Sequence, residues 1–206
     1  MVALTAGLLL WFGKRDVALP NQTSFQIRFI FIVSCLITEF LNLWCARWKA
    51  FHWALMGAVF AGCLMAACVM DLAEHMIYRY VWMACGITIM CFGMAEYGLI
   101  DGGRIMYVSR LGQWRDWLLF AALQQFLFAR MYGRADCHAF CCCGAIWMFE
   151  GGGFTLCVLH MVISFVLLTV VQLGRRNVTK KGRLKQAVPM LPYITAGFWI
   201  CQLWVN

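Results

Sequence analysis

Two aspartates that stand at the ends of apolar stretches are the residues best suited to do chemistry. Asp71 directly follows Cys68-Val69-Met70, and Asp136 lies shortly after the apolar run that ends at Tyr132. Ionisable groups at membrane depth are costly and are functional candidates for that reason. Two close carboxylates share one proton, so that one member can take a proton from water while the other polarises a peptide carbonyl. The pair therefore suggests an aspartic protease dyad; the alternative is that each aspartate only marks a helix end.

The composition of the chain places these aspartates in a membrane protein. Of the 206 residues, 64% are hydrophobic and 13% are charged, and the mean hydropathy is +0.76. A soluble chain is roughly 45–50% apolar and about 25% charged. These values exclude a soluble enzyme, a disordered tail and a disulfide-stapled secreted module. They indicate a polytopic membrane protein.

Long apolar runs define the elements that must position the aspartates. The runs cover 1–12, 27–46, 51–70, 81–99, 117–132, 139–149, 154–173 and 190–205. Since a spanning helix needs about 20 residues, we predict an all-α, polytopic transmembrane helix bundle with about seven to eight membrane segments. The first run is short, so it forms an interfacial helix or extends to Leu19. Small residues in 51–70, including Gly57 and Gly62, predict close helix packing.

Basic residues indicate how the segments are oriented. If each run from 27–46 onward crosses once, one face receives 12 of the 17 basic residues and the other receives 5. Cytoplasmic loops carry an excess of Lys and Arg, so the richer face is cytoplasmic, and both aspartates lie on it. Loop 174–188 alone supplies six of the twelve. The net charge of +8 therefore indicates orientation next to a lipid bilayer, and we expect no nucleic acid partner.

The cysteines are interpreted mostly as packing residues. Eight of the 12 lie singly inside apolar runs, where a free cysteine behaves as a small hydrophobe, and no C-x-x-C pair occurs in the sequence. Cys137 and the run Cys141–Cys143 cluster near His138 in the sequence. Cysteine and histidine are the side chains that most often bind zinc. Packing by small residues is the favoured interpretation of this cluster. We expect no metal and no cofactor.

Around Asp71 the sequence resembles the type IV prepilin leader peptidase family, the G-x-G-D aspartic proteases that cut at the membrane boundary. The first family motif is D-[LI]-x-x-x-x-I-P-N, and the chain reads D-L-A-E-H-M-I-Y-R at the same place. Asp71, Leu72 and Ile77 match in type and spacing. Tyr78 and Arg79 replace the usual Pro-Asn, so the chemistry of the turn differs.

Two further elements of that family recur around Asp136 and near the end of the chain. The second motif is G-x-G-D-x-K, and the chain reads G-R-A-D-C-H. Gly133 and Asp136 match, Ala135 replaces the second glycine, and His138 replaces lysine, which it can mimic when protonated. A third element of the form P-x-x-P-[FY] is similar to Pro189–Tyr193.

The resemblance covers residues 51–206, a prepilin-peptidase-like catalytic helix bundle, while 1–50 are N-terminal membrane segments that match weakly. It implies an aspartic endopeptidase of the cell membrane, multi-pass, with its active site facing the cytoplasm. The implied substrate and partner is a prepilin-like protein with a short basic leader, as used in type IV pili and protein secretion. Larger members carry paired C-x-x-C motifs and an N-methyltransferase activity. Because this chain has no such pairs, it resembles the short, peptidase-only form.

Other assignments remain open from the sequence. Asp16 precedes Leu19-Pro20-Asn21 and competes with Asp71, although its spacing to the proline does not fit the family motif. Glu39 with Asn42 lies inside run 27–46, where a structural hydrogen bond is favoured over a chemical role. The same acids suit a small cation- or proton-coupled transporter. The departures at Tyr78, Arg79 and His138 also suit a catalytically degenerate family member.

Overall fold

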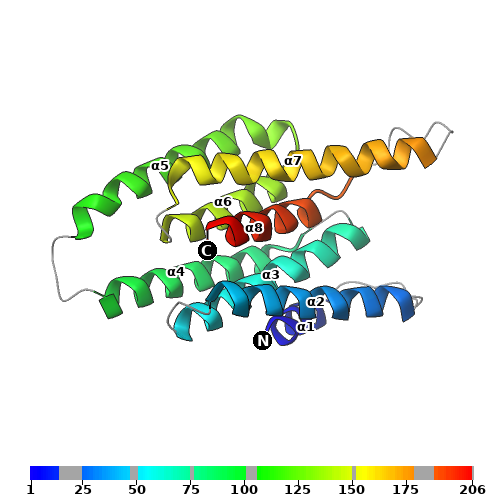
Figure 1. Cartoon of the computed structure of the whole chain (residues 1–206), viewed down its shortest axis with the longest axis horizontal. Coiled ribbons are helices and arrows are strands. Elements are labelled where there is room, and N and C mark those ends of the chain that lie inside the picture. The colour runs from blue at the N-terminus through cyan, green and yellow to red at the C-terminus, as the bar shows by residue number, and fades with distance from the viewer. Residues whose placement is uncertain are drawn as a thin grey trace. The chain divides into compact units, whose positions relative to one another are not determined.

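The described part of the chain is built of helices. The computed structural model describes residues 1–13, 25–46, 51–74, 77–100, 106–149, 152–178 and 188–205. Within these ranges the helices are α1 (Val2–Gly13), α2 (Phe25–Ala46), α3 (Phe51–Glu74), α4 (Arg79–Ile100), α5 (Met106–Phe126), the 3₁₀ turn η1 (Phe128–Arg130), α6 (Arg134–Phe149), α7 (Gly153–Val178) and α8 (Leu191–Val205) (Figure 1). The predicted all-α class is confirmed for these residues.

Each predicted apolar run corresponds to a helix, but the bounds of several runs differ from those of their helices. Run 117–132 covers only the second half of α5, which begins at Met106, and it extends past Phe126 into η1. Run 139–149 misses the start of α6 at Arg134. Helices α5 and α6 begin earlier than their runs because their first turns carry polar residues, which a helix accommodates but a hydropathy scan does not register.

The helices form two compact units, Met1–Gly102 and Gly103–Val205. In the first unit α3 contacts α1, α2 and α4 and is the central helix (Figure 1). A Cβ atom added at Gly62 of α3 would lie 2.6 Å from the Cβ of Thr5 in α1. The prediction that small residues of run 51–70 allow close packing is therefore confirmed. The predicted boundary at residue 50 concerns the extent of the family likeness and stays a prediction.

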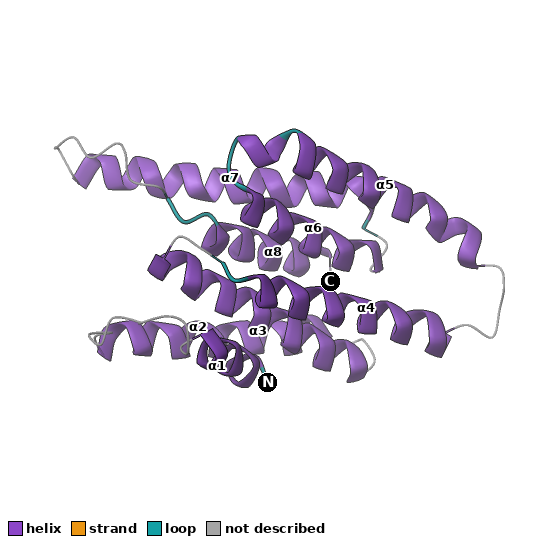
Figure 2. Cartoon of the chain, turned by 180° about the vertical axis from the view of Figure 1, so that it is seen from behind, coloured by secondary structure: helices purple, strands orange, loops and turns teal. Residues whose placement is uncertain are grey.

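The second unit packs α7 against α8 and α5 against α6, with further contacts between α6 and α7 (Figure 2). Aromatic rings fill its centre: the ring centroids of Phe140 and His160 are 5.2 Å apart, and those of Trp147 and Phe198 are 4.9 Å apart. Gly197 lets α8 approach α7 closely, because a Cβ atom there would lie 3.2 Å from the Cδ2 atom of His160. This ring cluster holds α6, α7 and α8 in place.

Two helices of the described residues are long and apolar enough to cross a membrane. They are Ala54–Leu72 in α3 and Gly153–Gly174 in α7, with mean hydropathies of 2.0 and 2.5. Shorter apolar helices cover Ile32–Trp44 and Arg79–Cys91. The larger number of seven to eight membrane segments stays a prediction. The two long helices differ in surroundings, since 67% of the first window is buried against 17% of the second.

Candidate functional site

Asp71 lies at the end of the central helix of the first unit. It is one residue from the end of the apolar span Ala54–Leu72 and three residues before the end of α3. Its exposed fraction is 9%, whereas the next residue, Leu72, is exposed. A carboxyl group that is covered by protein at the edge of an apolar helix fits the position that the sequence assigned to it.

After α3 ends at Glu74, the next described residues carry the rest of the first motif. Ile77 and Tyr78 lie between α3 and α4, both half-buried, and α4 begins at Arg79. The ring of Tyr78 stacks on that of Tyr80, with centroids 5.7 Å apart. A helix therefore starts where the family motif has Pro-Asn, although neither residue is present, because a helix start does not require proline.

Asp136 lies in the first turn of α6, where the partial positive charge of the helix N-terminus favours a carboxylate. Gly133 precedes this helix with a φ of +110°. A Cβ atom on Gly133 would lie 3.5 Å from the Oδ2 atom of Asp136, so the carboxylate bends back over the glycine. Ala135 is inside α6, and helical geometry imposes no cost on alanine. Gly133, whose positive φ favours glycine, is thus present. Ala135 stands where the motif has its second glycine, and the helical backbone there does not require glycine.

A buried polar cluster holds the turn in front of Asp136. The thiol of Cys137 donates to the backbone oxygen of Gln124 at 3.1 Å, and the Tyr132 hydroxyl donates to the Gln124 side-chain oxygen. The side-chain nitrogen of Gln124 in turn donates to the sulfur of Met161 at 3.4 Å. Burial raises the pKa of the Cys137 thiol to about 11. These contacts tie the end of α5 and the start of α6 to α7.

His138 is exposed on α6. Its Nδ1 atom lies 2.6 Å from the backbone oxygen of Arg134. Since a carbonyl oxygen only accepts, Nδ1 carries the hydrogen in this contact. The side chain is accessible from solvent, and its lysine-like role stays a prediction.

The two aspartates belong to different units: Asp71 to Met1–Gly102 and Asp136 to Gly103–Val205. Each has the local setting described above within its own unit. Their approach to one another stays a prediction.

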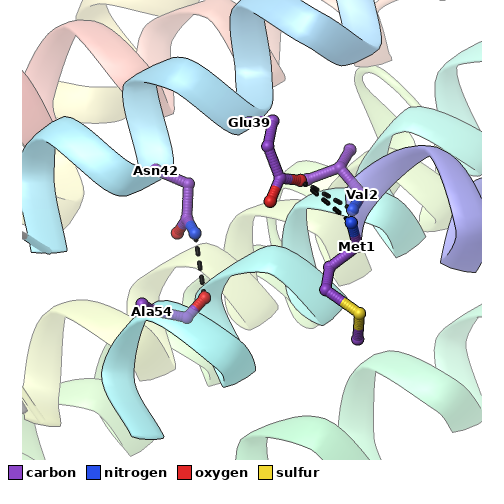
Figure 3. A network of polar contacts seen from close by, with 5 residues as sticks. All are labelled: Met1, Val2, Glu39, Asn42 and Ala54. Atoms are coloured by element: carbon purple, nitrogen blue, oxygen red, sulfur yellow. Dashed lines mark hydrogen bonds and ion pairs between the residues drawn. The ribbon is translucent and has the colours of Figure 1, made fainter. Parts of the chain in front are cut away.

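Glu39 has a structural setting (Figure 3). Its Oε2 atom accepts a hydrogen bond of 2.8 Å from the backbone N–H of Val2 and lies 3.5 Å from the amino group of Met1. One turn further along α2, the side chain of Asn42 donates to the backbone oxygen of Ala54 in α3 at 2.9 Å. Glu39 therefore caps the N-terminus of α1, and Asn42 joins α2 to α3. The prediction of structural hydrogen bonds for this pair is confirmed.

His160 was not among the residues predicted from the sequence. This residue lies in the middle of the apolar span Gly153–Gly174 and is fully buried. Its Nε2–H donates to the backbone oxygen of Ile194 at 2.8 Å, and its Nδ1 atom has no hydrogen-bond partner. A signal for it exists in the sequence, because an ionisable side chain within an apolar run is a functional candidate.

Among the described ranges, no three or more His, Cys, Asp or Glu side chains gather closely enough to hold a metal ion. Cys137 and Cys143 are buried in α6, and Cys141 and Cys142 are half-buried there. The rival Asp16 and the basic residues of 179–187 lie outside the described residues.

Comparison with protein-family models, with curated proteins and with solved structures gave no match to this chain. Any functional assignment therefore depends on the residues and on their local geometry.

Proposed function

We propose that this chain is a membrane-embedded aspartic endopeptidase that cleaves the basic leader of prepilin-like proteins, with Asp71 and Asp136 as its dyad. The observation that carries the proposal is the turn at Gly133. A φ of +110° is a conformation that glycine adopts readily and other residues rarely do. The turn comes directly before the helix start that presents Asp136, which is the arrangement that a G-x-x-D motif needs in order to orient its aspartate.

The membrane location is part of the same proposal. Helix α7 is apolar over Gly153–Gly174, and most of that window is not buried within the protein. Side chains such as Val162, Val166 and Val170 are exposed along it. Exposed apolar side chains in such number are stable when lipid covers them. We infer a multi-pass protein whose aspartates face the cytoplasm, in keeping with the distribution of basic residues.

In the proposed reaction the dyad acts through a shared proton. The ionised carboxyl takes a proton from a water molecule, which attacks the carbonyl carbon of the scissile peptide bond. The protonated carboxyl donates a hydrogen bond to the carbonyl oxygen, where negative charge develops. The proton then passes to the leaving amine, and the dyad returns to its starting state. This scheme requires no group beyond the two side chains and water.

The test uses the full chain in detergent micelles with a synthetic substrate that has a short basic leader before an apolar helix. The variants Asp71→Asn and Asp136→Asn are expected to abolish cleavage, because either one removes a carboxyl from the dyad. Asp116→Asn is the matched control, since Asp116 pairs with its neighbour Arg115 on α5. Asp16→Asn tests the rival residue and is expected to remain active. Cleavage by Asp136→Asn at the wild-type rate would refute the proposal.

A proton-coupled transporter is the second candidate, and His160 is the observation that favours it. His160 places a titratable imidazole, whose Nδ1 atom has no hydrogen-bond partner, inside an apolar span, and ionisable side chains at such depth mark proton pathways in transporters. Glu39, which the sequence offered for this role, is engaged by the N-terminus of α1. Proton uptake by the protein in lipid vesicles, lost in His160→Phe and retained in Asp136→Asn, would favour transport over proteolysis.

A further inference from the structure

A single buried residue, Gln124, contacts both ends of the segment that carries Asp136. Gln124 lies on α5 with an exposed fraction of 0%. Its side-chain oxygen accepts a hydrogen bond from the Tyr132 hydroxyl, and its backbone oxygen accepts one of 3.1 Å from the Cys137 thiol. Its side-chain nitrogen donates to the sulfur of Met161 on α7 at 3.4 Å. Because a buried amide is costly unless it is hydrogen-bonded, these contacts hold the side chain in one orientation.

The contacts with Tyr132 and Cys137 enclose the turn and the helix start. Tyr132 directly precedes Gly133, and Cys137 directly follows Asp136. Gly133, with its φ of +110°, is the residue of this segment with the greatest conformational freedom. Because the chain is fixed on both sides of this glycine by the same residue, the direction in which Asp136 leaves the turn depends on Gln124.

The thiol contact also fixes the rotation of α6 about its axis. Gln124 is two residues from the end of α5, where backbone oxygens have no donor within the helix, and the Cys137 thiol supplies one. Consecutive helical residues point about 100° apart, so a rotation of α6 that displaces Asp136 would also displace Cys137 from Gln124. The side chain of Asp136 is thus held at one angle around the helix.

The ring of Tyr132 has a second set of contacts that does not involve its hydroxyl. Its centroid lies 5.4 Å from that of Phe165 on α7 and 5.9 Å from that of Phe140 on α6, both in edge-on arrangements. Ring packing of this kind keeps the side chain in place when the hydroxyl is removed. The contribution of the hydrogen bond between Tyr132 and Gln124 can therefore be measured separately.

We propose that Gln124 is a positioning residue, which acts through Tyr132 and Cys137 to hold Asp136 in the orientation that proteolysis requires. The inference rests on the proposed function, in which Asp136 belongs to the catalytic dyad. A displacement of about 1 Å at a reacting group can lower the rate about 100-fold. A fully buried side chain offers no atom to the substrate. Loss of the Gln124 side chain should therefore lower kcat and leave KM unchanged.

The test measures cleavage of the leader-containing substrate by the full chain in detergent micelles. Gln124→Met keeps the length of the side chain and the backbone oxygen that Cys137 uses, but it removes the acceptor for Tyr132. We expect kcat to fall by about 10- to 100-fold, with KM unchanged. Gln124→Glu is the conservative variant: a buried carboxyl group is neutral, so its carbonyl oxygen accepts from Tyr132 and its O–H donates to Met161. This variant is expected to retain most of the wild-type kcat.

Two further variants show whether Gln124 acts through the turn. Tyr132→Phe removes the same hydrogen bond from its other side and is expected to lower kcat as well. The double variant of Gln124→Met with Tyr132→Phe should be no slower than the slower single variant, since both changes remove one shared interaction. Gln125→Met is the matched control, because it makes the same substitution on the next residue of α5, which is half-buried. It is expected to keep the wild-type kcat.

Hydrogen exchange of residues 127–138 reports on the turn without any need for activity. The backbone hydrogen bonds of this stretch include that from the N–H of Cys137 to the oxygen of Gly133 at 3.3 Å. Gln124→Met should speed exchange in this stretch, whereas the two variants that are expected to stay active should not.

Wild-type kcat in Gln124→Met would overturn the proposal, and so would an equal fall of kcat in Gln125→Met, which would indicate a general effect of packing. If the wild type itself cleaves no leader substrate, the proposed function fails, and hydrogen exchange alone decides whether Gln124 holds the turn. Faster exchange in Gln124→Met would then support that hold, and unchanged exchange would refute it.

Discussion

Replacement of Gly133 by alanine tests the turn on which the position of Asp136 depends. The φ of this glycine is +110°, beyond the left-handed well that other residues visit. An added Cβ atom would meet the Oδ2 atom of Asp136 at 3.5 Å, an ordinary contact, so steric overlap contributes nothing. The cost is therefore purely conformational.

The size of that cost follows from the backbone. Residues held in sparsely populated φ/ψ regions cost of order 1–3 kcal/mol. Alanine also reduces the entropy of the unfolded chain, which returns about 0.4–1 kcal/mol. The net expectation for Gly133→Ala is a loss of about 1–2 kcal/mol. For a chain of this size each kcal/mol lowers Tm by about 2–4 °C, which gives a decrease of about 2–8 °C.

The assay is thermal unfolding in detergent micelles followed by circular dichroism, together with cleavage of the prepilin-like substrate. Ala135→Gly is the matched control in the same motif. Because Ala135 is helical, glycine there costs only about 0.5–1 kcal/mol, and we expect activity to be kept. In Gly133→Ala the strain can be relieved only if the start of α6 shifts, which would move Asp136 and reduce cleavage. A Tm for Gly133→Ala equal to that of the wild type would show that the turn carries no strain and refute this reasoning.

Three further predictions follow from described contacts. Glu39→Gln weakens the cap on α1 and should lower the free energy of unfolding by about 1–2 kcal/mol. The control Asp116→Asn breaks a solvent-exposed ion pair and should change the free energy of unfolding by less than about 1 kcal/mol. Equal melting temperatures for the two variants would contradict the capping role of Glu39. Gly197→Ala forces α7 and α8 apart and should cost about 1–3 kcal/mol, while Gly174→Ala, where an added Cβ meets nothing within 4 Å, should be neutral or stabilising. The pKa of the Cys137 thiol is raised from 9.0 to about 11, so this thiol should react with iodoacetamide at pH 8 about 100-fold more slowly in the folded protein than after unfolding. The reaction rate in the folded protein should rise with pH up to about 11. Equal rates in the folded and the unfolded protein would contradict the burial of Cys137.

Local sequence was sufficient for the helical class and for placing Asp71 near the end of an apolar helix. Each apolar run predicted one of the described α-helices. A segment in an apolar environment must satisfy its backbone hydrogen bonds internally, and a helix does so. Gly133 and Asp136 were identified from their likeness to the G-x-G-D motif, and the positive φ of Gly133 and the start of α6 at Arg134 are now seen at this place. The hydropathy pattern did not predict the first turns of α5 and α6, because these turns carry polar residues.

Tertiary structure decided which polar groups meet. Glu39 was recognisable as an acid inside an apolar run, but only folding brings the N-terminus of α1 onto its carboxylate. His160 had a visible signal in its type and place, while its unpartnered Nδ1 atom depends on which carbonyl of α8 faces the ring. Composition and spacing describe the residues of a single helix. These contacts depend instead on how two helices are rotated and how closely they pack, and the shapes of all side chains in the interface determine both.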